Sequence, residues 1–446
     1  MQVVAHAMLV VVHVFDLMLL ESNLRQRPAA EAAFRWCGQF RGMNAPAPYV
    51  CLRFALAGPG YTRDVFLPFC NRILLAGCFA AVSCGCLHSQ PAKVQSISAQ
   101  ALAWTMQDSG TTAGLRGIYS VDSKVAWASG TDGTVLKTVD GGVHWTKCAV
   151  PDAATDGATL DFRGVQAWFD FDEAVVMASG PGDKSRIYRT TDGCKSWSLE
   201  ATNLEKNGFW DAILYVSWHY FGDPVMPDSA VVLGDPIGGR FDVRRYPSPS
   251  GVGREVSAKS WQADSKACNA KDGEALFAAS NSSAALTNNW KFVIGTGGKS
   301  GAYLLIPEIK ETGKKANPCQ RITVPMAGGS DSSGIFSLAF RDEIHGIAVG
   351  GDYAKPNESS GTAASTNDGG LHWIASEKPP HGYRSSVAWS EDLRVWITAG
   401  TNGSDISRDD GKTWQAVDDG NWNALSLPFV VGPKGRIARL SVAAGK

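Results

Sequence analysis

The octet Thr138-Val-Asp-Gly-Gly-Val-His-Trp145 decides the fold, because three further segments of the chain repeat its pattern. The pattern is Ser/Thr-x-Asp-x-Gly-x-x-Trp, and Cys194 replaces the glycine in one copy. The other copies occupy residues 190–197, 366–373 and 407–414. Four octets with one internal spacing indicate a repeat protein, in which each repeat is one supersecondary unit.

The chemistry of the octet is that of a tight turn. An aspartate carboxylate accepts hydrogen bonds from nearby backbone N–H groups, and glycine adopts a positive φ without a Cβ penalty. The tryptophan then starts the next strand and buries a large ring between neighbouring sheets. We therefore interpret the following octet residues as structural rather than catalytic: Asp140, Asp192, Asp368, Asp409, Trp145, Trp197, Trp373 and Trp414.

A second repeated signal is a short apolar run that ends in glycine. Short β-branched runs bounded by glycine are typical of buried strands. These runs end at Gly130, Gly180, Gly234, Gly295, Gly350, Gly400 and Gly432. Seven runs over residues 100–446 leave about 50 residues for each repeat, which suits a blade of four strands. The sequence therefore predicts an all-β fold, a seven-bladed β-propeller with four-stranded blades.

The two ends of this region are expected to close the ring. The last repeat stops after its third strand, at residues 435–440, and has no octet. A strand around Trp104 precedes the first repeat and resembles the strands that follow the octets. We predict that the Trp104 strand completes the seventh blade, which removes the exposed edges of the sheet.

The first ninety-nine residues are expected to lie outside the propeller. Residues 65–88 contain a cation, an apolar run and small residues, which is the layout of a secretion signal, and residues 89–99 form a linker. We interpret residues 1–64 as a non-native or disordered extension, with Val65 or Leu67 as the true start. Cys84 or Cys86 is a candidate for lipid attachment. The predicted location is the periplasm, the extracellular space or a lipid anchor in a bacterium.

Composition excludes some classes of function. The formal net charge is −1, which argues against a polybasic nucleic-acid binder. The ten cysteines are too few for a disulfide scaffold of this length. Cys268 and Cys319 either pair in an oxidising compartment or remain free thiols, and the sequence leaves both alternatives open.

The octets resemble the Asp-box, or BNR, repeat. Residues 100–446 also resemble the bacterial propellers related to photosystem II stability/assembly factors, with the likeness carried by segments 160–164, 185–192, 334–341 and 350–353. The resemblance implies a seven-bladed propeller. Asp-box propellers include sialidases, other glycoside hydrolases and binding modules, so the fold does not decide the activity.

Propeller geometry gathers a set of polar residues at one mouth. The start of the first strand and the end of the second strand of each blade share one face, opposite the octets. Two sets of candidate residues are therefore expected at this mouth. The candidate ligand-binding residues are Arg116, Arg163, Arg384, Tyr383, Asp352 and Tyr353, and the candidate acid–base residues are Asp211, Asp235 and Glu274. The arginines either clamp an anionic sugar beside catalytic carboxyls, or pair with those carboxyls around a wet channel.

Several motifs fail on inspection. A sialidase would carry Arg-Ile-Pro before its first octet, and the chain has only Arg186-Ile-Tyr and Arg436-Ile-Ala. Residues 295–301 lack the glycine spacing of a phosphate loop or dinucleotide fingerprint, and the eight histidines lack metal-ligand spacing. We expect no cofactor and no metal.

The sequence thus favours an exported scaffold that binds an unknown glycan, anionic ligand or protein partner. The first alternative is a glycoside hydrolase, which is favoured over an oxidoreductase if the chain is an enzyme. The second alternative is an assembly factor for a membrane complex.

Overall fold

The computed structural model divides the chain into two compact units, Met1–Val94 and Gln95–Lys446. It describes residues 102–167, 171–216, 229–247, 262–263, 268–287, 292–307 and 319–442. In the first unit it describes only two antiparallel strands, β1 (Phe34–Gly38) and β2 (Val50–Phe54). The predicted signal at 65–88 and the cysteines proposed for lipidation lie outside the described residues. Within the described ranges, no helix has the length and apolar character needed to span a membrane.

The described part of the second unit is built almost entirely from antiparallel sheets. Five of these sheets have four strands and a sixth has nine. The first three are β4 (Leu115–Ser120), β5 (Ala126–Gly130), β6 (Val135–Thr138) and β7 (Thr146–Lys147); β8 (Phe162–Ala167), β9 (Ala174–Ala178), β10 (Arg186–Thr190) and β11 (Ser198–Thr202); and β12 (Trp210–Val216), β13 (Ser229–Ile237), β14 (Arg240–Pro247) and β15 (Gln262–Ala263). Two single-turn 3₁₀ helices, η2 (Gly157–Thr159) and η3 (Gly182–Lys184), lie in loops of this part.

The nine-stranded sheet consists of two groups of strands. One group is β16 (Glu274–Ala275), β17 (Ala284–Leu286), β18 (Phe292–Gly298), β19 (Tyr303–Ile306) and β20 (Gln320–Thr323), and the other is β21 (Ser333–Phe340), β22 (Gly346–Asp352), β23 (Ala363–Thr366) and β24 (Ile374–Ala375). Both β16 and β17 pair with β18, so they are the two halves of one interrupted strand. A single residue pair, Gly297 with Gly334, joins the two groups.

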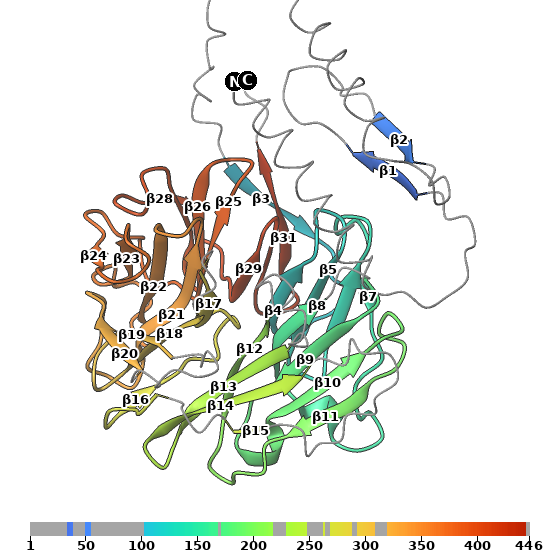
Figure 1. The fold of residues 1–446 in the computed structure, drawn as a ribbon, viewed down its shortest axis with the longest axis horizontal. Helices are drawn as coiled ribbons and strands as arrows, with labels where there is room; N and C mark the ends of the chain where they lie inside the picture. Colours follow the sequence, from blue (N-terminus) through green and yellow to red (C-terminus); the bar gives the residue numbers. More distant parts are fainter. Residues whose placement is uncertain are drawn as a thin grey trace, which may run out of the picture. The chain divides into compact units, whose positions relative to one another are not determined.

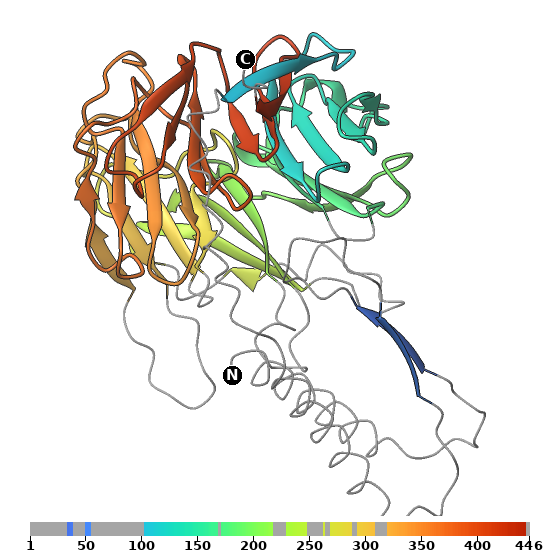
Figure 2. The ribbon, with the colours of Figure 1, turned by 90° about the horizontal axis from the view of Figure 1, so that it is seen from above.

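The last two sheets bring the ends of the second unit together. They are β25 (Ser386–Ser390), β26 (Val395–Gly400), β27 (Gly403–Ser407) and β28 (Gln415–Asp418), followed by β29 (Ala424–Ser426), β30 (Phe429–Val431), β31 (Ile437–Val442) and β3 (Leu102–Gln107). Strand β3 pairs with β31, and Trp104 lies opposite Leu440. The predicted pairing of the chain ends is confirmed (Figure 1, Figure 2).

The first strands of the sheets form a closed circuit of contacts. Strand β4 contacts β8, β8 contacts β12, β12 contacts β17, β17 contacts β21, β21 contacts β25, β25 contacts β29, and β29 returns to β4. Side chains on these strands bond to the neighbouring backbone. Asn423 Nδ2 donates to the Leu115 carbonyl at 2.7 Å, and the Val387 N–H donates to Ser337 Oγ at 3.0 Å. The sheets therefore surround a common centre (Figure 1).

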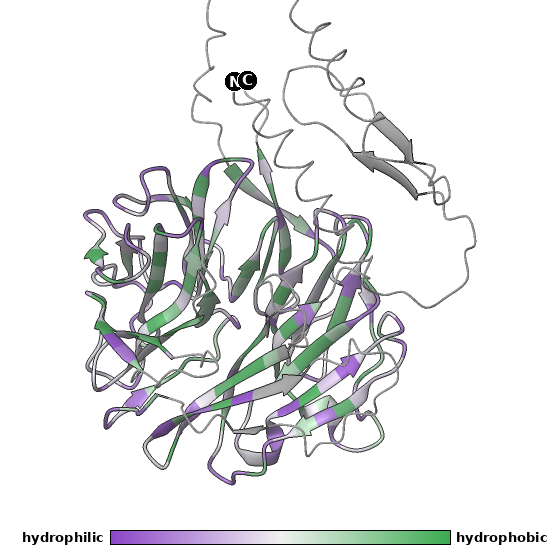
Figure 3. Ribbon diagram, viewed as in Figure 1, coloured by the Kyte–Doolittle hydropathy of each residue, from purple (hydrophilic) through white to green (hydrophobic). Residues whose placement is uncertain are grey.

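The hydrophobic core lies between the faces of neighbouring sheets. One cluster joins Trp127 of β5 to Phe162 of β8 and Tyr188 of β10, all almost fully buried. Figure 3 shows apolar residues concentrated along the strands and hydrophilic residues in many of the connecting loops. The octet tryptophans contribute to this packing. Trp414 is 2% exposed, and Trp145 packs edge-on against Phe429 with ring centroids 5.6 Å apart.

Candidate functional site

Each octet starts at the last residue of a third strand and ends just before the fourth strand. In the first octet, Thr138 Oγ1 donates to Asp140 Oδ1 at 2.9 Å and accepts the Gly142 N–H. The same carboxylate accepts the His144 N–H at 3.0 Å and lies 2.7 Å from His144 Nδ1. The hydrogen bonds from the His144 backbone and side chain lower the pKa of Asp140 to about 2. The aspartate is thus engaged within its own turn.

The other three octets repeat this bonding. Asp192, Asp368 and Asp409 each accept one N–H from the residue four positions later, at 3.0, 2.9 and 2.9 Å. Their second carboxylate oxygen meets the side chain of that same residue, which is Ser196, His372 or Thr413. Four separate turns with one bonding pattern agree with a structural role for these carboxylates.

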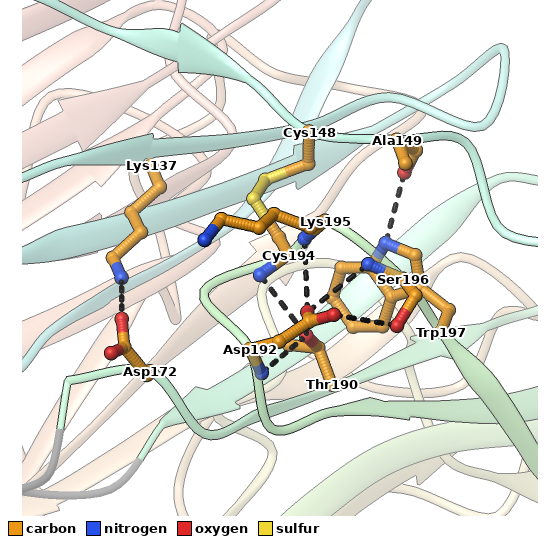
Figure 4. The surroundings of a disulfide bond; sticks show 10 residues. All are labelled: Lys137, Cys148, Ala149, Asp172, Thr190, Asp192, Cys194, Lys195, Ser196 and Trp197. Carbon is orange, nitrogen blue, oxygen red and sulfur yellow. Dashed lines mark hydrogen bonds and ion pairs between the residues drawn. A yellow bond between two sulfur atoms is a disulfide. The ribbon is translucent and has the colours of Figure 1, made fainter.

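The four cysteines described in the second unit form two disulfides. Cys268 pairs with Cys319, which was one of the two alternatives left open by the sequence. Cys148 pairs with Cys194, a bond that sequence reasoning missed (Figure 4). The sequence feature that could have indicated this disulfide is the cysteine at a glycine position of the second octet. Its partner, however, lies 46 residues away in the chain, beside a different sheet.

Arg116 and Arg163 meet at a carboxylate that the sequence did not single out. Arg163 Nε donates to Asp161 Oδ2 at 2.9 Å, and Arg116 Nε lies 3.7 Å from Asp161 Oδ1. The side chains of the two arginines are 29% and 37% exposed. Arg116 Nε and Asp161 Oδ1 have no hydrogen-bond partner among the described residues. The two arginine side chains are therefore partly accessible, whereas Arg116 Nε and Asp161 Oδ1 themselves are buried.

Arg384 has a different environment from the other two arginines. Its side chain has no exposed surface and forms an ion pair with the buried Asp405. Its Nη1 also donates to the Tyr383 carbonyl at 2.7 Å and to Asn402 Oδ1 at 2.6 Å. We leave Arg384 out of the candidate site, because a guanidinium without exposed surface offers nothing to a ligand.

Glu274 is also enclosed by the fold. Its carboxylate accepts hydrogen bonds from Thr296 Oγ1 at 2.6 Å and from the Lys271 N–H at 2.8 Å. Arg321 completes its surroundings with an ion pair, and the Glu274 side chain has no exposed surface. A carboxylate held by three donors and closed to solvent does not suit an acid–base role, so we withdraw it from the catalytic candidates.

The carboxyl of Asp211 is buried, and the half-buried Asp235 lies near enough to influence its charge. Asp211 is 2% exposed, and its Oδ2 has no hydrogen-bond partner among the described residues. Burial, followed by the charge of Asp235, raises the pKa of Asp211 well above its usual value. Burial also raises the pKa of Asp235, although its Oδ1 accepts the Leu276 N–H at 3.0 Å. Both shifts favour the uncharged form of each carboxyl, relative to a carboxyl in water.

An aromatic cluster on the same face contains one exposed ring. Phe277 and Phe336 stack with ring centroids 3.9 Å apart, and Tyr383 meets Phe336 edge-on at 4.8 Å. These three rings are buried, whereas Tyr353 is 53% exposed beside them. Asp352 caps the adjoining turn by accepting the Ala354 N–H at 3.0 Å. Tyr353 is therefore the accessible aromatic residue of this cluster.

The segment between β16 and β17 connects the polar and aromatic clusters. Its Leu276 N–H bonds to Asp235, Phe277 belongs to the aromatic cluster, and the Ala278 carbonyl accepts from Arg163 Nη1 at 3.3 Å. Farther on, Asn281 bonds to Ile213 of β12, and Ser280 Oγ donates to the Ser385 carbonyl beside β25 at 2.6 Å. A segment bonded to sheets on several sides must cross the middle of the ring.

The described residues offer no metal site. They contain no group of three or more histidines, cysteines, aspartates or glutamates placed to hold a metal ion.

Comparison with known proteins identifies a fold. No family model matches the chain, and no curated protein matches it. A structure titled "YCF48 bound to D1 peptide" aligns with a TM-score of 0.50 and 18% identity, over 76% of this chain and 97% of that one. YCF48 from Cyanidioschyzon merolae gives 0.45 and 19% over 76% and 98%, and the WD40 β-propeller domain of Doa1 gives 0.47 and 12% over 76% and 97%. The chain has an all-β propeller scaffold of four-stranded antiparallel sheets.

Proposed function

We propose that the chain is an exported seven-bladed Asp-box propeller that acts as a binding or assembly scaffold. The blade count is supported by the circuit of seven first strands, if the nine-stranded sheet is divided at its single Gly297–Gly334 pair. The Asp-box assignment is supported by the common bonding of the four octets.

The partly exposed arginine cluster is the observation that carries the binding role. Arg116 and Arg163 share the Asp161 carboxylate, and their side chains remain 37% and 29% exposed. Partly exposed guanidinium groups suit an anionic group, which they bind with charge-assisted hydrogen bonds. The exposed Tyr353 on the same face suits a sugar ring or an apolar side chain.

The ligand is an anionic glycan or an acidic segment of a protein. The structure titled "YCF48 bound to D1 peptide" is a precedent for peptide binding by this fold. On that analogy, we propose an assembly-factor-like role for a membrane complex as the protein-binding version of this function. The likeness in fold favours peptide binding, but the arginine site itself has to be tested.

The test is binding by the double variant Arg116→Gln, Arg163→Gln. The probes are sialyllactose, a heparin tetrasaccharide and an acidic peptide, measured by calorimetry. Losing hydrogen bonds to a charged ligand costs about 1.5–3 kcal/mol each, so affinity for the true ligand class should fall at least about tenfold. Arg394→Gln is the matched control, because Arg394 is exposed and pairs only with nearby Glu391 among the ion pairs of the described residues. Equal affinity in both variants would reject the arginine cluster as the site.

A glycoside hydrolase remains the second candidate, and the Asp211–Asp235 pair is the observation that favours it. Retaining and inverting glycosidases both use two carboxyls, one of them with a raised pKa. The burial of Asp211 argues against access by a sugar. Turnover of aryl glycosides by the wild type, abolished in Asp235→Asn, would establish this candidate, and absence of turnover on a broad panel would remove it.

Export is supported by cysteine chemistry. The four cysteines described in the second unit, Cys148, Cys194, Cys268 and Cys319, are all in disulfides. Disulfides form and persist in oxidising compartments such as the periplasm and the cell exterior. This is consistent with a signal at residues 65–88, with or without lipidation at Cys84 or Cys86.

A further inference from the structure

Cys194 occupies a backbone position that the other octets give to glycine. Its φ is 71°, and the glycines at the same octet position have φ values of 84° at Gly142, 90° at Gly370 and 81° at Gly411. A residue with a Cβ atom is disfavoured in this left-handed region. The second octet therefore holds a strained cysteine where its relatives in the chain hold an unstrained glycine.

The Cys148–Cys194 bond fastens two sheets to each other. Cys148 follows β7 of the first sheet, and Cys194 follows β10 of the second sheet. Beside the bond, the Ala149 N–H donates to the Cys194 carbonyl at 3.2 Å, and Trp197 Nε1 donates to the Ala149 carbonyl at 2.9 Å. Figure 4 shows the disulfide lying over this turn. These two hydrogen bonds support the contact that the disulfide makes between the turn and the first sheet.

Cys194, one end of this bond, lines an open pocket. The pocket is lined by Lys137, Asp140, His144, Gly193 and Cys194 among others, and Cys148 is not part of its lining. Lys137 Nζ forms an ion pair with Asp172 at 2.8 Å and lies close to Gly193, the neighbour of Cys194. A nearby ammonium group stabilises a thiolate, which makes a cysteine a better partner in exchange reactions.

We propose that Cys148–Cys194 is a thiol–disulfide exchange site for a partner that carries a reduced dithiol. A partner thiolate attacks Cys194 Sγ from the pocket, the S–S bond breaks, and Cys148 leaves as a thiolate that takes up a proton. The second partner thiol loses its proton and attacks the mixed disulfide, which releases Cys194 as a thiolate. Two electrons pass from the dithiol, which becomes a disulfide, to the cystine. The strained φ of Cys194 relaxes once the bond is open.

The second disulfide, Cys268–Cys319, is an internal control because it is more exposed than Cys148–Cys194 and lacks the positive φ. Neither Cys268 nor Cys319 has a positive φ, and Cys319 is partly exposed whereas Cys194 is 5% exposed. Exposure would favour reduction at Cys268–Cys319 first, and backbone strain favours Cys148–Cys194. The order in which the two disulfides are reduced therefore shows whether solvent exposure or backbone strain controls the rate of reduction.

The experiment is reduction of the full chain under native conditions, with alkylation and peptide mapping over time. With dithiothreitol, we expect Cys148–Cys194 to open at least about tenfold faster than Cys268–Cys319, and with glutathione the first adduct should form on Cys194. Lys137→Gln should slow this reduction several-fold, whereas Lys434→Gln, a change at a lysine with no ion pair among the described residues, should leave it unchanged. Reduction of Cys268–Cys319 first, or of both bonds at the rate of global unfolding, would overturn the proposal.

A second variant separates a folding effect from an exchange effect. The double change Cys148→Ser, Cys194→Gly restores the octet glycine and removes the bond without strain. We expect this variant to fold and to give no mixed disulfide with a thioredoxin whose resolving cysteine is replaced, whereas the wild type should be trapped by it. Equal trapping of the two chains would place the reaction elsewhere and reject the site.

Discussion

One aspartate in each octet organises the whole turn through its two oxygens. Asp409 accepts Ser407 Oγ at 2.8 Å and the Thr413 N–H at 2.9 Å on one oxygen, and Thr413 Oγ1 at 2.6 Å on the other. These bonds fix the path from β27 to β28. A carboxylate used in this way is engaged within its own turn and contributes to stability.

We predict that Asp409→Ala lowers the free energy of unfolding by about 1–2 kcal/mol, the range found for lost caps and side-chain hydrogen bonds. Urea unfolding measures this change. Arg408→Ala is the matched control, because this exposed neighbour forms no hydrogen bond or ion pair among the described residues, and it should change stability by less than about 0.5 kcal/mol. Ligand binding should persist in folded Asp409→Ala. Loss of binding with full stability would identify the octet as a site instead.

The buried Asp211 should make stability depend on pH in the opposite sense to the octet carboxylates. Its pKa is raised by burial and by Asp235, so the unfolded chain ionises first as the pH rises. Its contribution is complete below the unfolded pKa of about 3.9 and is lost as the pH rises through the folded pKa. We predict that Asp211→Asn is more stable than the wild type at pH 7, with the difference shrinking towards pH 4. A difference independent of pH would contradict an uncharged Asp211.

The strands and turns differ in how far the sequence predicted them. The octets were predictable because their bonds join residues two to four positions apart. The glycine-ended runs were predictable because each is a short apolar stretch that can be recognised in the sequence by itself. The burial of Arg384 was not, because its partner Asp405 is on another strand, 21 residues away. Glu274 is held by Arg321, 47 residues away, and the Cys148–Cys194 bond joins two sheets. Those side-chain environments depend on packing between elements, which periodicity and spacing do not encode.

The segment between β16 and β17 depends on one asparagine. Asn281 accepts the Ile213 N–H at 2.7 Å and donates to the Ile213 carbonyl at 3.0 Å, so its side chain replaces a paired strand. Its φ is 61°, a conformation that asparagine tolerates better than alanine. This segment also holds the carbonyl of Ala278 against Arg163. Asn281 therefore supports the candidate site from beneath.

We predict that Asn281→Ala costs about 2–3 kcal/mol of stability, from two lost hydrogen bonds and an unfavourable φ. Asn281→Gly also loses both bonds but accepts the positive φ, so it should be about 1 kcal/mol less destabilised than the alanine variant. Thermal and urea unfolding of the pair measure this difference. Equal stability of the two variants would mean that the segment relaxes its backbone on losing the asparagine.

Export of the protein should remove its N-terminal segment. The apolar run within residues 65–88 predicts removal of everything before about residue 80. Mass spectrometry of the mature protein from its native host should find peptides of the propeller and none from residues 1–63. Peptides from that segment in the mature protein would reject the signal, and the disulfides would then need another oxidising environment.

Ring closure decides whether the second unit survives truncation. Strand β3 pairs with β31 over six residues, and Trp104 Nε1 donates to Ser404 Oγ at 2.8 Å across the sheet boundary. A chain that starts at Gln100 keeps this strand, whereas one that starts at Gly110 loses it and exposes the edge of β31. Large-to-small truncation of a fully buried aromatic residue costs about 3–5 kcal/mol, so the loss of the half-buried Trp104 costs less than this. Total stability is typically about 5–15 kcal/mol.

Losing the Trp104 ring and a ladder of backbone hydrogen bonds should therefore remove most of the stability margin and promote aggregation through the free edge. The chain from Gln100 should unfold cooperatively by calorimetry, and the chain from Gly110 should be aggregated or unfolded. Trp104→Phe in the longer chain is the control, because it keeps the ladder and most of the ring and should lower the melting temperature only slightly. Equal melting temperatures for the two truncations would mean that the ring closes without β3, and the proposed count of seven blades would lose its support.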